Sequence, residues 1–194
     1  MMEVLKITKE KLTKNKETCQ YEYDGDIDFS GHIEIESDLG YVKFSAGIKA
    51  SGHIWAKSGT GIEAGTGIKA GTGIKAGTGI EAGWGIEAGE GIEAGTGIGA
   101  GDGIKAGWGI KAGEGIKAGW GIEAGWGIEV GTGIEAGWGI EAGEGIITFY
   151  YGISAKWILA IRVAAGLYTK KEIQTVKSEL RGDTMVVLGK VEKP

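Results

Sequence analysis

The sequence predicts an all-β chain that folds as a three-sided parallel β-solenoid, or β-helix, with 18 residues in each coil. Three observations predict this fold. A six-residue repeat runs through the middle of the chain, charged residues 18 positions apart alternate in sign, and tryptophans occupy two of the three corner columns that this spacing generates. Glycine makes up 40 of the 194 residues, but its gaps alternate between two and four residues, which excludes collagen.

The repeat determines which side chains face inward. From Ile62 to Ile146 an isoleucine stands at every sixth position, and the consensus unit reads I-(E/K)-A-G-X-G. A period of six suits strands, whose side chains alternate between two faces, and does not suit a helix of about 3.6 residues per turn. We therefore expect Ile and Ala to be buried and the charged residue to face water. Position X includes carboxylates, so it must project outward at each corner. The flanking glycines are expected to form the corner, because glycine tolerates positive φ and tight bends without steric cost.

The number of sides follows from the insertions and the charges. Triplets such as Ile27-Asp28-Phe29 extend the pattern upstream, and grouping by three places all three breaks in spacing at one corner. The same grouping stacks Lys69, Glu87, Lys105 and Glu123 in one column of alternating charge. Opposite charges on neighbouring strands attract, so this register is favoured. We expect about seven coils over residues 27–155, with residues 1–26 forming an N-terminal cap and residues 156–194 a C-terminal cap, since open terminal coils recruit other chains.

The corner columns provide the candidate binding residues. One column holds Trp84, Asp102, Trp120, Trp138 and Trp157, and a second holds Glu90, Trp108, Trp126 and Glu144. The third holds threonine and Glu114. Rows of exposed indole rings are unusual on a monomer, and tryptophan is enriched at interfaces. We predict that these nine residues bind a partner. The alternative is that the rings lie flat over the corner glycines and shield backbone.

The two histidines are the remaining candidates for chemistry. His32 and His53 stand at equivalent positions of adjacent coils, so they should lie one above the other. We expect two exposed corner histidines, because no further His or Cys completes a metal site. We predict no catalytic residue, no metal and no cofactor. A transferase site at His53, beside the two-residue insertion that precedes Ile62, is the alternative.

Composition limits the partners and the compartment. Formal net charge is −5, but 21 basic and 26 acidic residues are interspersed, which argues against a nucleic-acid partner. Cys19 is the single cysteine, so no disulfide framework exists and a reducing cytoplasm is expected. No apolar run approaches the roughly 20 residues of a membrane-spanning helix, so no membrane association is expected.

Two resemblances extend this interpretation. The sixfold period with a triangular coil resembles the hexapeptide-repeat left-handed β-helix of bacterial acyltransferases, which implies a left-handed coil. Over residues 48–157, the repeat (GIEAGWGIEAGEGI) is similar to uncharacterised glycine-rich repeat proteins of gut Firmicutes and their prophages. That resemblance implies a phage origin and, by association, inhibition of host defence in the host cytoplasm.

The expected function is therefore non-enzymatic. We predict a phage-type scaffold that binds a host protein, in the manner of an anti-CRISPR inhibitor, with a homo-oligomer through the caps or tryptophan rows also open. The first alternative is a self-assembling structural protein, such as a component of a phage particle. The second is a hexapeptide-type acyltransferase.

Overall fold

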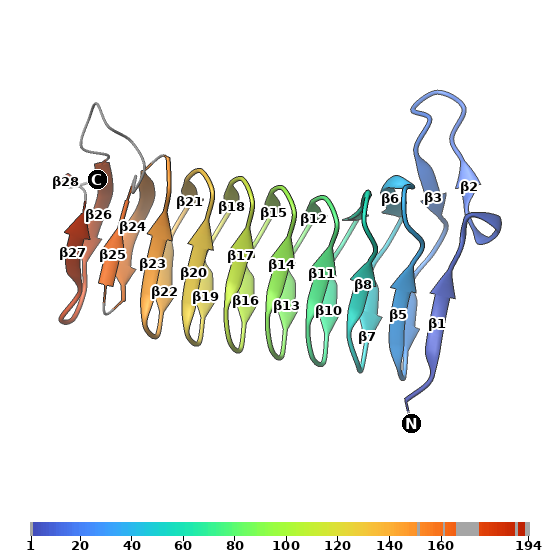
Figure 1. Cartoon of the computed structure of the whole chain (residues 1–194), viewed down its shortest axis with the longest axis horizontal. Coiled ribbons are helices and arrows are strands. Elements are labelled where there is room, and N and C mark those ends of the chain that lie inside the picture. The colour runs from blue at the N-terminus through green and yellow to red at the C-terminus, as the bar shows by residue number, and fades with distance from the viewer. Residues whose placement is uncertain (1, 151, 161, 166–174, 189, 193–194) are drawn as a thin grey trace.

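The computed structural model describes residues 2–150, 152–160, 162–165, 175–188 and 190–192. Among them the regular structure is almost entirely strand, and the one helix is a short 3-10 turn, η1 (Lys9–Lys11). The coils stack in a single straight row, with β1 at one end and β27 and β28 at the other (Figure 1). The predicted parallel β-solenoid is confirmed.

Three columns of parallel strands form the three faces. Face 1 consists of β4 (Ile27–Phe29), β7 (Ile48–Ala50), β10 (Ile68–Ala70), β13 (Ile86–Ala88), β16 (Ile104–Ala106), β19 (Ile122–Ala124) and β22 (Gly139–Ala142). Face 2 consists of β1 (Val4–Ile7), β5 (His32–Ile35), β8 (Ile54–Ala56), β11 (Ile74–Ala76), β14 (Ile92–Ala94), β17 (Ile110–Ala112), β20 (Gly127–Val130), β23 (Gly145–Thr148), β25 (Arg162–Ala164) and β27 (Met185–Leu188). Face 3 consists of β3 (Tyr21–Tyr23), β6 (Gly40–Phe44), β9 (Thr60–Ala64), β12 (Ile80–Ala82), β15 (Ile98–Ala100), β18 (Ile116–Ala118), β21 (Ile134–Ala136) and β28 (Lys190–Glu192).

Two longer strands turn the corner from face 3 to face 1. They are β24 (Ile153–Leu159), which pairs with both β21 and β22, and β26 (Thr175–Leu180), which pairs along β24. In the regular part of the stack, neighbouring strands pair residues 18 apart, such as Ile68 with Ile86. The three predicted insertions all fall between face 2 and face 3, so the three-sided register is confirmed.

The stack is longer than predicted. Face 2 alone contains ten strands and gives about nine turns, where the sequence predicted about seven. The difference arises because segments outside the repeat add strands to the same faces. β1 pairs in parallel with β5, β3 pairs with β6, and β25 and β27 extend face 2 beyond β23. These segments lack the hexapeptide spacing, and the repeat period alone could not place them.

The coil is right-handed, so the predicted left-handed coil is wrong. The inward-facing Ile68 donates its N–H to the Gly85 carbonyl of the next coil (3.0 Å), and the inward-facing Ala50 accepts from Gly71 of the next coil (3.0 Å). In an extended L-peptide, the directions of the strand and the side chain together fix the side to which N–H and C=O point. An inward side chain whose backbone groups point to the following coil requires a right-handed coil.

Isoleucine and alanine form the core, as predicted. The repeat isoleucines are almost fully buried, with exposed fractions between 0% and 3%. Burial of one isoleucine side chain contributes roughly 1.5–3 kcal/mol to the free energy of folding. Each strand of the repeat buries one such isoleucine. At the N-terminal end Ile35 and Phe44 replace alanine as the second inward residue, and both are fully buried.

The corner glycines form the bends as predicted, but they are needed for space and not for positive φ. Among the described glycines, φ is positive at Gly25, Gly40, Gly59 and Gly182, and none of these belongs to the regular repeat. A Cβ on the glycine after each alanine would lie closer than 3.0 Å to the backbone of the previous coil, as at Gly107 against the Gly89 carbonyl. Glycine therefore stands here because two backbones approach closely.

Charged columns form on the outer faces, as predicted. Lysine ammonium and glutamate oxygen atoms of adjacent coils lie 2.8–3.0 Å apart in the pairs Lys69–Glu87, Lys75–Glu93, Lys105–Glu123 and Lys111–Glu129. The hydrogen bond from Lys105 to Glu123 raises the pKa of that lysine. These side chains are exposed, so solvent screens the pairs and each adds little to stability. Their main effect is to favour the pairing of residues 18 apart over other alignments of neighbouring coils.

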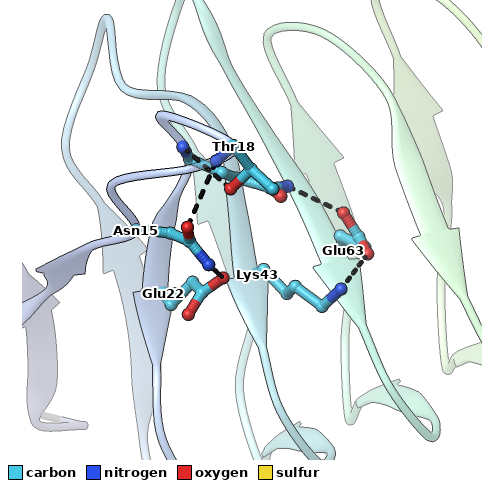
Figure 2. Close-up of polar contacts among 6 residues, drawn as sticks. Asn15, Thr18, Glu22, Lys43 and Glu63 are labelled. Atoms are coloured by element: carbon cyan, nitrogen blue, oxygen red, sulfur yellow. Dashed lines mark hydrogen bonds and ion pairs between the residues drawn. The ribbon is translucent and has the colours of Figure 1, made fainter.

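A hairpin extends face 3 at its N-terminal end. β2 (Thr13–Lys14) pairs antiparallel with β3. Figure 2 shows how polar side chains attach it to the coils: Gln20 Nε2 donates to Glu63 (2.7 Å), and the same carboxylate pairs with Lys43 (3.1 Å). Within the loop, Asn15 donates to Glu22 (2.8 Å). Glu63 thus joins the hairpin to two strands of face 3.

Candidate binding surfaces

Two corners of the prism display the predicted tryptophans. Ridge A, between faces 3 and 1, contains Trp84, Asp102, Trp120 and Trp138. Ridge B, between faces 1 and 2, contains Glu90, Trp108, Trp126 and Glu144. Backbone hydrogen bonds link each member to the next coil, as where Trp138 N–H donates to the Trp120 carbonyl (2.8 Å). The structure therefore brings eight of the nine predicted binding residues into two rows.

The rings of both ridges are largely in solvent. The five tryptophans are between 55% and 71% exposed. Trp108 and Trp126 stack with centroids 6.0 Å apart and planes 17° apart, while the Lys156 ammonium lies 4.3 Å from the Trp138 ring. More than half of each ring contacts water, so the shielding of corner glycines accounts for little of their surface.

Trp157, the ninth residue, does not continue ridge A. It pairs with Gly139 in the register of face 1, and Lys156 takes the place above Trp138. Its ring covers Gly139, its Nε1 is buried without a hydrogen-bond partner, and the Arg181 guanidinium lies 4.4 Å from the ring. The displacement follows from β24, which carries the chain around this corner as continuous strand. Trp157 is thus a half-buried packing residue of face 1.

Each face carries a shallow groove between its first corner and its charged column. The volumes are about 720 Å³ on face 1, 840 Å³ on face 2 and 830 Å³ on face 3. The floor of each groove is the glycine that precedes the repeat isoleucine, where no side chain fills the space. Trp84 and Trp138 line groove 1, while Trp108 and Trp126 line groove 2.

The chain fills two of these grooves with its own aromatic rings. Tyr41 lies over Gly61 and Gly79 in groove 3, and its burial raises the pKa of the phenol. Trp157 covers Gly139 in groove 1. In the described part of the chain, no ring contacts the glycines of groove 2. The grooves therefore accept flat rings, and groove 2 has none.

The histidines form a packed pair, and the predicted exposed corner positions are wrong. The His32 and His53 rings stack with centroids 4.0 Å apart, and the His53 N–H donates to His32 Nδ1 (3.1 Å). Both are half-buried, and the backbone at Gly52 packs against the His32 ring. Burial, and then the neighbouring His32, lower the pKa of His53. Its Nε2 is buried without a partner, and the residue lines groove 2.

Two observations bear on the metal and transferase alternatives. Among the described residues there is no group of three or more His, Cys, Asp or Glu side chains that could hold a metal ion. The insertion beside His53 closes as a tight turn, in which Thr60 N–H donates to Lys57 (3.0 Å) and Gly59 has φ +72°. The turn follows β8, whereas His53 precedes that strand.

Two exposed apolar residues were not among the predicted site residues. Trp55 and Ile147 stand in the outward column of face 2, where the repeat has Glu or Lys, and they are 41% and 38% exposed. Both line groove 2. Their signal in the sequence is an apolar residue at the outward position of a triplet, a position that lies outside the corner columns.

Comparison with protein-family models, with curated proteins and with solved structures found no match for this chain. Over the described residues, no helix has the length and apolar character needed to cross a bilayer.

Proposed function

We propose that the protein is a non-enzymatic scaffold that binds a partner protein through ridge A. The observation that carries this proposal is the exposure of Trp84, Trp120 and Trp138, at 63%, 71% and 55%, on one edge of a rigid stack of coils. A protein interface is the usual place in which such rings become buried. Ridge B and its groove are a second exposed surface.

The expected affinity is large enough to be useful. A buried tryptophan removes 150–250 Å² from water, so covering the exposed half of a ring removes about 100 Å² and contributes about 2.5 kcal/mol. Three rings together contribute about 7 kcal/mol before the costs of association. The backbone of each ring is held by coil-to-coil hydrogen bonds, which lowers the entropy that binding must remove.

The charge of ridge A indicates the chemistry of the partner. Asp102 lies between Trp84 and Trp120 and has no ion pair within the described residues. A matching surface would offer apolar pockets at the spacing of the coils and a lysine or arginine opposite Asp102. The resemblance to prophage repeat proteins names a host defence protein in the cytoplasm as the partner, in the manner of an anti-CRISPR inhibitor; that identity stays a prediction.

The test is affinity capture from host lysate with quantitative mass spectrometry. The Trp120→Ala/Trp138→Ala variant should lose a partner that the natural sequence retains, and Asp102→Lys should weaken its capture. Thr96→Ala/Thr132→Ala is the matched control, because it truncates two side chains of the third corner column at the same repeat position. A partner that the tryptophan variant retains, with its circular dichroism unchanged, would exclude ridge A as the binding surface.

A further inference from the structure

Face 2 exposes several apolar groups and holds one buried polar atom that has no hydrogen bond. Trp55 and Ile147 are exposed near the two ends of groove 2, the stacked Trp108 and Trp126 rings line the same groove, and the His53 Nε2 is buried with no hydrogen bond. Grooves 1 and 3 are partly filled by Trp157 and Tyr41. The unoccupied groove and the exposed apolar residues therefore coincide on a single face.

The outward-facing side chains of face 2 are complementary to the same side chains of a second copy that runs in the opposite direction. Along the stack the column contains, one coil apart, Trp55, Lys75, Glu93, Lys111, Glu129 and Ile147. When a second copy is turned end over end about the midpoint between Glu93 and Lys111, each lysine meets a glutamate. The apolar Trp55 then meets the apolar Ile147. We propose that face 2 is the interface of an antiparallel, two-fold homodimer.

The corner residues agree with this arrangement. In a two-fold interface, if one residue contacts a second, the second contacts the first in the other copy. The two-fold places Trp126 opposite Thr72 and Trp108 opposite Glu90, because these residues lie at equal distances from the midpoint of ridge B. Each tryptophan ring of ridge B therefore faces a small or polar side chain of the second copy, and no ring faces another ring.

The same operation places a polar group near the unpartnered histidine. His53 comes opposite Gly145 of the second copy, since both residues precede the inward isoleucine of their coils. Gly145 has no side chain that would block the approach, and Glu144 is its neighbour in the chain. The dimer thus adds the Glu144 carboxylate of the second copy to the surroundings of His53, where the chain itself provides Glu34.

The apolar residues at the two ends of the column are the stronger evidence for the dimer. Any column of strictly alternating charges pairs each lysine with a glutamate when a two-fold axis passes midway between two of its residues, so the four charged residues alone are weak evidence. Trp55 and Ile147 depart from the repeat at equal distances from the same midpoint, and alternation does not explain that. Opposed apolar residues at both ends would also fix the register.

The predicted contact is small. The six strands from β8 to β23 span about 24 Å at about 4.8 Å per strand, and a face with its corners is about 18 Å wide. Each copy therefore buries about 430 Å², or about 860 Å² in total, which is below the roughly 1,000 Å² of stable specific interfaces and typical of a weak, transient one. A dissociation constant in the micromolar range is expected.

Sedimentation equilibrium from about 1 to 300 μM tests the proposal, because that range brackets micromolar dissociation. The natural sequence should pass from monomer to dimer. Lys75→Glu should weaken the dimer at least about tenfold, because the introduced carboxylate then faces Glu129 of the other copy at both symmetry-related contacts. Adding Glu129→Lys should restore association. The control is Lys69→Glu, which breaks an equivalent exposed pair on face 1 and should leave the dimer intact.

Several outcomes would overturn the proposal. A monomer at every concentration would do so, as would weakening by Lys69→Glu without weakening by Lys75→Glu, or a failure of Glu129→Lys to restore the dimer. Trp120→Ala/Trp138→Ala changes ridge A alone, so loss of a foreign partner with an unchanged dimer separates this proposal from the proposed function.

Discussion

Substituting two neighbouring corner glycines with alanine distinguishes close backbone approach from backbone conformation. At Gly107 an added Cβ would lie closer than 3.0 Å to the Gly89 carbonyl oxygen. At Gly91, on the same corner one coil earlier, the nearest atom would be 3.5 Å away, which is ordinary contact. Neither residue has positive φ, so a purely conformational role predicts the same small effect at both.

The expected magnitudes are well separated. Relief of the contact at Gly107 requires the two coils to separate by about 1 Å, which lengthens the hydrogen bond from Gly107 N–H to the Ala88 carbonyl (3.0 Å). Overpacking costs about 1–3 kcal/mol and a weakened buried hydrogen bond about 1 kcal/mol, so a loss of about 2–4 kcal/mol is expected. Gly91→Ala adds no such contact and restricts the unfolded chain, so its effect should lie within about 1 kcal/mol.

Guanidinium unfolding followed by circular dichroism measures the difference. Because repeat arrays can unfold in stages, the midpoint of the first transition is the quantity to compare. Equal destabilisation by both variants, or an unchanged midpoint for Gly107→Ala, would refute the explanation by close approach.

Three further predictions concern the N-terminal half. The folded chain lowers the pKa of His53, so just below pH 6.5 the unfolded chain binds more protons than the folded chain does. The melting temperature, measured at low protein concentration, should therefore fall as the pH falls through that value. The His53→Gln variant should show a smaller fall. Thr60→Val should cost about 1–3 kcal/mol in chemical unfolding, because the buried hydroxyl bonds two backbone groups of the turn before β6. Glu63→Ala should speed amide exchange in β3 and leave the central coils unchanged, because it removes the contacts to Gln20 and Lys43.

The repeat made the middle of the fold predictable because each of its positions has one physical role. Ile68 and Ile86 had to be inward, and the carboxylate at Glu90 had to be outward. The insertions and the charges then left one register. Handedness was different: a six-residue period is compatible with either hand, and the resemblance to left-handed solenoids decided it wrongly. The hydrogen-bond direction at Ile68 settles it, and no residue pattern carries that information.

The site was predictable only to the extent that it follows the repeat. Trp108 and Trp126 lie where the 18-residue spacing placed them. Trp157 does not, because β24 runs through the corner as strand and displaces the ring onto Gly139. The stacking of His32 on His53 followed from the spacing, but their burial depended on the neighbouring backbone. The sequence did not predict groove 2, because its floor is a column of glycines between the corner column and the charged column. Glycine has no side chain whose pattern would indicate a binding site.

The corner position X separates folding from binding in this protein. Thr96, Asp102, Glu114 and Trp120 occupy equivalent corners of the solenoid, and backbone bonds between coils form at all of them. The fold therefore accepts small, charged and large aromatic residues at X with little difference, since the side chain lies outside the core. Folding alone cannot explain why five exposed tryptophans gather on two corners and none stands on the third. Under the proposed function, a partner surface supplies that selection.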